Sequence, residues 1–208
     1  MLYQEDNMKL IVITQEQSWK NEAHCINLLF ENGLELLHLR KPGYTKEEIS
    51  ALLNDISPCF HRNIVIHDHF SLLTKFDLKG IHLNRRNPVP IKKQGITISK
   101  SCHSLEEIKN WNDRISYAFL SPIFNSISKT GYQGAFTEEE LQQAKEKNII
   151  NEKIIALGGI TAENIPQIKS YGFGGIAVLG SLWEDIILDK NENNLLERFK
   201  KIQFISNE

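Results

Sequence analysis

Cysteine, long apolar runs and an excess of charge of one sign are all scarce in this chain of 208 residues. Its three cysteines, Cys25, Cys59 and Cys102, are widely spaced and form no CxxC pair, which argues against a disulfide framework or a thiolate metal site. The 24 lysines and arginines do not outnumber the 26 aspartates and glutamates, so the basic surplus of a nucleic-acid-binding surface is missing. The apolar runs, such as Lys9–Thr14, are far too short to span a membrane. With no apolar core of signal-peptide length near Met1 either, the sequence predicts a cytoplasmic protein that binds neither nucleic acid nor membrane.

Several short motifs that would identify a site are also absent. No G-x-G-x-x-G follows the first apolar run, where Gln15-Glu16-Gln17 stands instead, so a dinucleotide-binding sheet is disfavoured. No H-x-x-H or H-E-x-x-H spacing suggests zinc, and no serine nucleophile motif occurs. His82, inside an apolar run, is expected to be a hydrogen-bonded core residue.

What the chain does have is a regular alternation of short apolar runs and amphipathic stretches. Many of the runs (LIVI, NIVI, GIAVL) lack polar alternation, which is typical of parallel strands that are covered on both faces. The eight expected strands are Lys9–Thr14, Leu36–Arg40, Asn63–His67, Gly80–Leu83, Thr97–Ser101, Tyr117–Leu120, Lys153–Leu157 and Gly175–Leu179.

Helix starts between these runs complete the pattern. Thr45, Ser104 and Thr137 each precede a glutamate by three residues, the spacing of a capping box. The connections after the third and fourth strands are short, so we expect single turns there. Eight strands alternating with helices predict an α/β protein with a single (β/α)8 TIM barrel over residues 1–208, in which residues 1–8 form a loose extension. An open doubly wound sheet is the alternative.

In such barrels the active site lies at the carboxyl ends of the strands. There His38 and Arg40 share the parity that points into the barrel, and Asp68 follows the third strand. Cationic side chains gather at the same end, which indicates an anionic ligand: Arg40, Lys41, Arg85, Arg86, Lys100 and Lys129. Gly158, Gly159 and Gly180 follow the last two strands, where backbone N–H groups can approach a phosphate.

The ordered strand ends resemble thiamine phosphate synthases and their thiazole tautomerase relatives. The segments are HLRKP, NIVIHDH, GIHLNRRN, SKSCHSLEE, LSPIFNSISKTG, ALGGIT and GIAVLGS. They cover nearly the whole chain. The resemblance implies a transferase of thiamine biosynthesis that joins an aminopyrimidine diphosphate to a thiazole phosphate, using Mg²⁺ and releasing diphosphate.

The resemblance also implies roles for individual residues. Arg40 and Lys129 would hold the diphosphate, Ser101 would lie near the leaving group, and Asp68 with Asn87 would bind Mg²⁺. The remaining positions implied to contact the phosphorylated substrates are His38, Lys41, His67, Ser126, Ser128, Gly158, Gly159, Gly180 and Ser181.

The chain departs from the family's pattern at four positions near these strand ends. His38 replaces a glutamine, Pro42 a lysine, His67 an asparagine and Asn87 a second acid. Asn87 can donate a carbonyl to Mg²⁺ but adds no charge. These departures leave two alternatives open, a catalytically silent phospho-ligand-binding paralogue and a tautomerase-like isomerase. Pro122 stands where the tautomerases have a histidine, which favours the synthase. The sequence leaves a homo-oligomer open.

Overall fold

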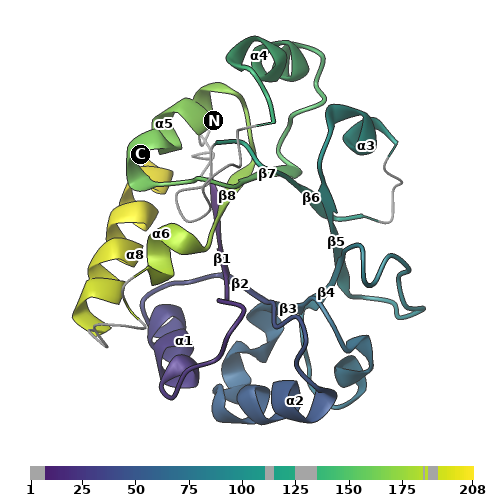
Figure 1. Ribbon diagram of the computed structural model, residues 1–208, viewed down its shortest axis with the longest axis vertical. Helices are drawn as coiled ribbons and strands as arrows, with labels where there is room; N and C mark the ends of the chain where they lie inside the picture. Colours follow the sequence, from purple (N-terminus) through teal and green to yellow (C-terminus); the bar gives the residue numbers. More distant parts are fainter. Residues whose placement is uncertain (1–7, 111–114, 125–134, 185, 187–191) are drawn as a thin grey trace, which may run out of the picture.

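Eight parallel strands close into a barrel in sequence order (Figure 1). The structure is a computed structural model, and it describes residues 8–110, 115–124, 135–184, 186 and 192–208. The strands are β1 Lys9–Ile13, β2 Leu36–Leu39, β3 Ile64–Ile66, β4 Gly80–Leu83, β5 Thr97–Cys102, β6 Tyr117–Leu120, β7 Ile154–Leu157 and β8 Gly175–Val178. All eight expected strands are therefore confirmed, and the predicted (β/α)8 barrel with them.

Helices surround this ring of strands (Figure 1). They are α1 Glu22–Glu31, α2 Lys46–Asp55, α3 Leu105–Lys109, α4 Glu138–Glu146, α5 Ile165–Ser170, α6 Gly180–Trp183 and α8 Glu192–Asn207, with 3₁₀ turns η1 Pro58–Asn63, η2 Phe70–Thr74 and η3 Ala162–Asn164. Only the single turn η2 follows β3, and residues 84–96 between β4 and β5 contain no helix, as the short connections predicted. None of the helices in the described part of the chain is long and apolar enough to cross a bilayer.

The expected helix starts are set by side-chain caps. The hydroxyls of Thr45 and Thr137 accept from the backbone N–H three residues on, and Glu48 and Glu140 complete the capping boxes. Ser104 caps α3 in the same way through the N–H of Glu107. Local sequence thus fixes where these helices begin.

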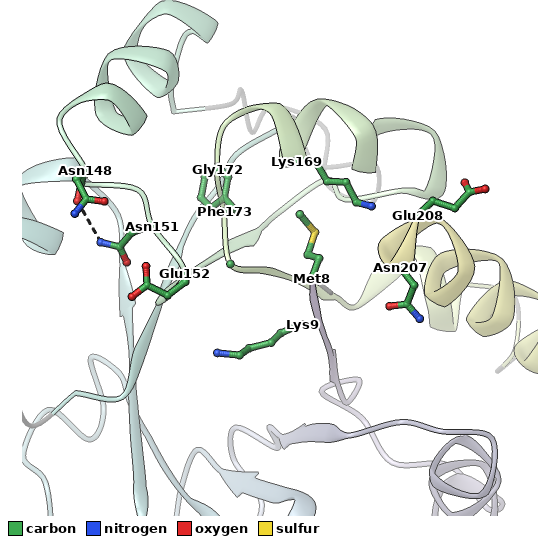
Figure 2. A pocket seen from close by; sticks show the side chains of 11 residues that line it. Met8, Lys9, Asn148, Asn151, Glu152, Lys169, Gly172, Phe173, Asn207 and Glu208 are labelled. Atoms are coloured by element: carbon green, nitrogen blue, oxygen red, sulfur yellow. Dashed lines mark hydrogen bonds between the residues drawn. The ribbon is translucent and has the colours of Figure 1, made fainter. Parts of the chain in front are cut away.

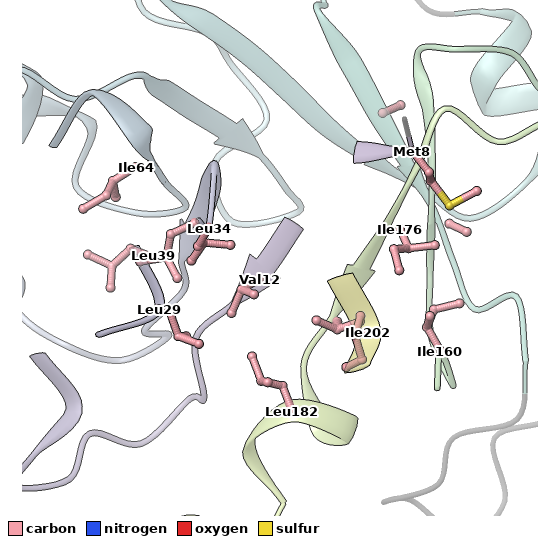
Figure 3. Close-up of a cluster of buried hydrophobic side chains, with 14 of the residues drawn as sticks. Met8, Val12, Leu29, Leu34, Leu39, Ile64, Ile160, Ile176, Leu182 and Ile202 are labelled. Atoms are coloured by element: carbon pink, nitrogen blue, oxygen red, sulfur yellow. The ribbon is translucent and has the colours of Figure 1, made fainter. Parts of the chain in front are cut away.

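Two apolar layers hold the barrel together. The inner layer fills the barrel and includes Ile11, Val65 and Phe119. The outer layer lies between strands and helices, and Val12 of β1 belongs to it together with Leu29 of α1 and Ile202 of α8 (Figure 3). Strand residues alternate between the two layers because successive side chains point to opposite faces. The same alternation aims the polar residues at the strand ends into the barrel mouth.

The amino-terminal end of the described chain corrects one expectation. Met8 was expected to belong to a loose extension, but it is 7% exposed and packs in the outer layer. Residues 1–7 of the expected extension lie outside the described residues. A cavity of about 770 Å³ opens beside Met8 and Lys9, with Glu152 and Gly174 among its lining (Figure 2). It lies at the amino ends of β1, β7 and β8, opposite the end where barrel chemistry takes place.

Candidate active site

Three histidines from neighbouring strands meet at the floor of the barrel mouth. His38 lies on β2, His67 follows β3 and His82 lies on β4, and all three are buried. Nδ1 of His38 is 2.9 Å from Nε2 of His67, and the rings of His67 and His82 stack with centroids 4.2 Å apart. The sequence predicted His38 and His67 as substrate contacts and His82 as a core residue. The structure joins them in one cluster.

Hydroxyl groups surround this histidine cluster. Tyr117 Oη lies 2.5 Å from Nε2 of His38. Ser99 Oγ and Ser101 Oγ lie 2.8 Å from Nδ1 and Nε2 of His82, respectively. Ser101, expected near a leaving group, is therefore oriented by a buried imidazole. Tyr117 and Ser99 were not predicted, although their inward parity on β6 and β5 was a signal that could have found them.

The cluster is electrically neutral at physiological pH. Burial lowers the pKa of His38 and of His67 well below the usual histidine value, and nearby imidazoles lower both further. Burial, followed by the charge of Arg40, lowers the pKa of His82 to about 3. Burial also raises the pKa of Tyr117, which keeps the phenol protonated. The mouth floor is thus an uncharged, polar surface beneath a charged rim.

Asp68 sits on that rim between an arginine and an amide. Arg86 donates from Nε to Oδ1 at 3.0 Å and from Nη2 to Oδ2 at 2.9 Å. Asn87 donates from Nδ2 to Oδ1 of Asp68 at 2.8 Å and to the carbonyl of His67 at 3.0 Å. Asp68 and Asn87, the two expected metal ligands, are therefore brought together. Arg86 was not predicted as a partner of Asp68. Its hydrogen bonds to Asp68 raise the pKa of the guanidinium.

The donor set fits Mg²⁺ in its chemistry. A carboxylate and an amide carry the oxygen donors that Mg²⁺ accepts, and this ion usually takes only one or two carboxylates with waters and substrate phosphates. Asp68 is 15% exposed, so a ligand can reach it. Arg86 engages both carboxylate oxygens, so its guanidinium competes with a metal ion for this carboxylate.

Arg40 stands above the histidine cluster at the end of β2. Its Nη1 lies 2.6 Å from Oε1 of Glu16, and its side chain is 28% exposed. Thr14 Oγ1 accepts from the Arg40 amide N–H and donates to its carbonyl, which fixes the backbone at this strand end. The negative charge of Glu16 also acts on Arg86. Arg40, Glu16, Arg86 and Asp68 therefore form one charged group at the mouth.

Lys41 does not reach the mouth in this structure. Its side chain is fully buried, and its Nζ donates to Oε1 of Glu22 at 2.6 Å and to the carbonyl of Gln15 at 2.7 Å. The rings of Trp19 and Tyr44 lie within 6 Å of the ammonium. Burial and the ion pair with Glu22 hold the ammonium away from the mouth in this structure, so the expected contact between Lys41 and a substrate stays a prediction. Glu22, at the start of α1, was not predicted.

Two of the three glycines expected to hold a phosphate have backbone conformations that suit glycine. Gly158 and Gly159 follow β7 with φ values of +100° and +65°. A Cβ atom on Gly158 would lie 2.9 Å from both Cα and Cβ of Pro122. Gly180 and Ser181 begin α6 after β8. Ser181 Oγ is buried without a hydrogen-bond partner in the described structure, so this strand end has an unused donor and acceptor.

The remaining expected residues are not all assembled. Ser126, Ser128 and Lys129 lie outside the described residues. Arg85 is exposed. Lys100 alternates with the inward-facing Ser99 and therefore belongs to the outer face of β5.

Comparisons with known proteins identify the family of the chain and support its fold. The model of the family described as thiamine monophosphate synthase matches residues 10–182. A thiamine-phosphate synthase of Pediococcus pentosaceus is 24% identical over 196 residues, covering 86% of this chain and 90% of its own. A crystal structure of thiamine phosphate pyrophosphorylase from Bacteroides thetaiotaomicron is 44% identical with a TM-score of 0.85, covering 95% of this chain and 97% of that one. A Pyrococcus furiosus pyrophosphorylase structure, 20% identical with a TM-score of 0.71 and coverages of 95% and 98%, supports the fold.

Proposed function

Because the chain belongs to the thiamine monophosphate synthase family, we propose that its barrel mouth joins an aminopyrimidine diphosphate to a thiazole phosphate. In this reaction the bond between the pyrimidine methylene carbon and the diphosphate oxygen breaks. The thiazole nitrogen then supplies the electron pair for the new carbon–nitrogen bond, and diphosphate leaves. The protein is thus a transferase of thiamine biosynthesis, and we place it in the cytoplasm.

The observation that carries the proposal is the charged group above a neutral floor. Arg40, Arg86 and Asp68 are gathered at the carboxyl ends of β2, β3 and β4, over buried uncharged imidazoles. A departing diphosphate needs fixed positive charge, whereas the aromatic pyrimidine needs an uncharged polar surface. The two parts of the mouth match the two parts of this substrate.

Each described residue then has a task. Arg40 binds the diphosphate with a guanidinium that Glu16 and Thr14 orient. His38 and His67 face the pyrimidine, and Ser101 donates to the leaving group from a position that His82 fixes. Asp68 and Asn87 would hold Mg²⁺, which when bound neutralises charge on the diphosphate. Lys41 supports the mouth indirectly, because it ties the end of β2 to α1 through Glu22.

The thiazole phosphate is assigned to the other side of the mouth. The backbone after β7, at Gly158 and Gly159, and the start of α6, at Gly180 and Ser181, can offer N–H groups to phosphate oxygens. The unpartnered Oγ of Ser181 supports this assignment. Lys129, Ser126 and Ser128 remain predicted ligand contacts from the sequence.

The test is the formation of thiamine phosphate from the two substrates and Mg²⁺, detected after oxidation as fluorescent thiochrome. We expect product with the wild type, loss of product with EDTA, and at least a hundredfold loss in Asp68→Ala and Arg40→Gln. Arg62→Gln is the matched control, since Arg62 is an exposed arginine in η1 bound to Asp77, and it should retain wild-type turnover.

Three outcomes would contradict the proposal. Full turnover in both Asp68→Ala and Arg40→Gln would place the chemistry elsewhere. Thiazole phosphate binding by calorimetry without product under any metal would identify a silent phospho-ligand-binding paralogue. Metal-independent tautomerisation of a thiazole carboxylate phosphate would identify an isomerase.

A further inference from the structure

The histidine cluster has a second chemical capacity that the proposed synthesis does not use. One ring nitrogen from each of His38, His67 and His82 lies within 4.8 Å of the other two. We propose that these three imidazoles form a binding site for a divalent transition metal such as Zn²⁺ or Co²⁺, separate from the Mg²⁺ site at Asp68. The proposal rests on the geometry of the cluster and does not depend on the proposed function.

The spacing of the ring nitrogens suits such an ion. Nitrogen ligands 2.0–2.1 Å from a tetrahedral zinc lie about 3.4 Å apart. The His38–His67 pair at 2.9 Å must spread slightly, and separations of up to 4.8 Å must close by as much as roughly 1.4 Å. The ion would replace the His38–His67 hydrogen bond. Each neutral imidazole keeps its one proton, so the histidine that donates this bond must carry the proton on its other ring nitrogen when the metal is bound.

The surroundings already contain the outer hydrogen bonds that orient metal-binding histidines. When Nδ1 of His38 ligates, its Nε2–H can donate to Tyr117 Oη, 2.5 Å away. Whichever nitrogen of His82 ligates, the other keeps a serine hydroxyl at 2.8 Å, from Ser99 or Ser101. Such outer partners fix the ring orientation and raise the basicity of the ligating nitrogen.

The type of ligand selects the type of metal. Three imidazoles favour Zn²⁺, Co²⁺, Ni²⁺ or Cu²⁺, whereas Mg²⁺ prefers oxygen. The carboxylate of Asp68 follows His67 directly in the chain, but it is held by Arg86 and Asn87. The two sites are therefore neighbours with different ligand chemistry. A bound transition metal would also occupy the imidazoles that we assign to the pyrimidine.

The main charge opposing a cation here is Arg40. Its positive charge acts on both His67 and His82. The carboxylate of Glu16, 2.6 Å from Arg40 Nη1, partly offsets it. Arg40→Gln removes this positive charge and should therefore tighten transition-metal binding. The same substitution removes a side chain that we assign to diphosphate binding, so it should impair synthesis.

The experiment is a titration of the full, metal-free chain with Co²⁺ alone, followed by visible absorption. We expect one equivalent to bind with the d–d bands of a tetrahedral nitrogen-ligated ion, and Zn²⁺ to displace it. His38→Gln and His67→Asn should each weaken binding at least tenfold. Asp68→Asn and His24→Gln, an exposed histidine on α1, should bind as the wild type does.

Other results would overturn the site. No saturable binding by the wild type, or unchanged binding in His38→Gln, rules it out. Loss of binding in Asp68→Asn with retention in His67→Asn would assign the ion to the Mg²⁺ site. If the histidine variants do not fold, imidazole ¹⁵N NMR of the wild type decides. Zn²⁺ must shift the nitrogens of His38, His67 and His82, and shifts confined to His24, His69 or His103 would contradict the proposal.

Discussion

Arg86 donates two parallel hydrogen bonds to Asp68, one to each carboxylate oxygen, at 3.0 and 2.9 Å. Of the two expected metal ligands, Asp68 and Asn87, only Asp68 is acidic. A guanidinium and a divalent cation compete for such a carboxylate. The pair therefore sets how readily Mg²⁺ can enter the mouth.

Arg86→Gln should lower the Mg²⁺ concentration that gives half-maximal synthesis. The Arg86 side chain is 44% exposed, so we assign the interaction only about 1 kcal/mol, or roughly a fivefold shift in the Mg²⁺ requirement. Thiochrome formation across a Mg²⁺ titration measures it. Arg85→Gln, which changes the exposed neighbouring arginine, is the control and should leave the requirement unchanged. A higher requirement in Arg86→Gln would show that Arg86 assists the metal.

Glu22→Gln should destabilise the fold strongly. It leaves the ammonium of Lys41 buried with its carboxylate partner removed, which typically costs about 3 kcal/mol or more in the free energy of unfolding. Urea denaturation of the variant and the wild type measures the loss. Adding Lys41→Met should recover much of it, because the unpaired charge is then absent. Glu163→Gln breaks an exposed pair with Lys201 and should cost under about 1 kcal/mol. A double variant no more stable than Glu22→Gln would refute this explanation.

Stability should fall in acid partly because of His82. Its pKa is lowered from the ordinary 6.5 to about 3 in the folded protein, chiefly by burial. Between these two pH values the unfolded chain therefore binds more protons than the folded protein. The stability that the neutral His82 contributes is fully present above pH 6.5 and is lost as the pH falls toward 3. Urea unfolding at pH 7 and pH 5 should show a smaller loss in His82→Gln than in the wild type. Equal losses in both proteins would contradict the assignment.

Gly158→Ala should lower the stability of the fold more than Gly95→Ala does. Both positions have positive φ, +100° and +74°, so each alanine is strained by about 1 to 2 kcal/mol. At Gly158 the added Cβ also meets Pro122 at 2.9 Å, whereas at Gly95 nothing lies within 4 Å. The collision should add about 1 kcal/mol or more. Thermal unfolding of the two variants compares them directly, and equal destabilisation would show that Pro122 moves away without cost.

The fold followed from the sequence because its signals are local. Apolar runs of strand length placed all eight strands within about two residues, and Thr45 and Thr137 located two helix starts through their capping boxes. Parity along β2 correctly placed His38 inside the barrel and Leu39 in the outer layer.

The hydrogen-bond and ion-pair partners of the site residues could not be predicted from the sequence, because they come from segments far apart in the chain. Asp68 was expected to bind a metal, and in the structure its carboxylate accepts hydrogen bonds from Arg86, which follows the next strand. Lys41 was assigned to the mouth by its neighbours in sequence, but α1 brings Glu22 to its ammonium, and burial makes that pairing decisive.

The sequence by itself determined the eight-strand barrel and the family to which the chain belongs, since strand periodicity and ordered motifs act over a few residues. Tertiary structure alone decided which charges are used up in ion pairs and which imidazoles meet. His38 and His82 lie on β2 and β4 and His67 directly follows β3, and only the pairing of these strands in the barrel brings the three rings into contact.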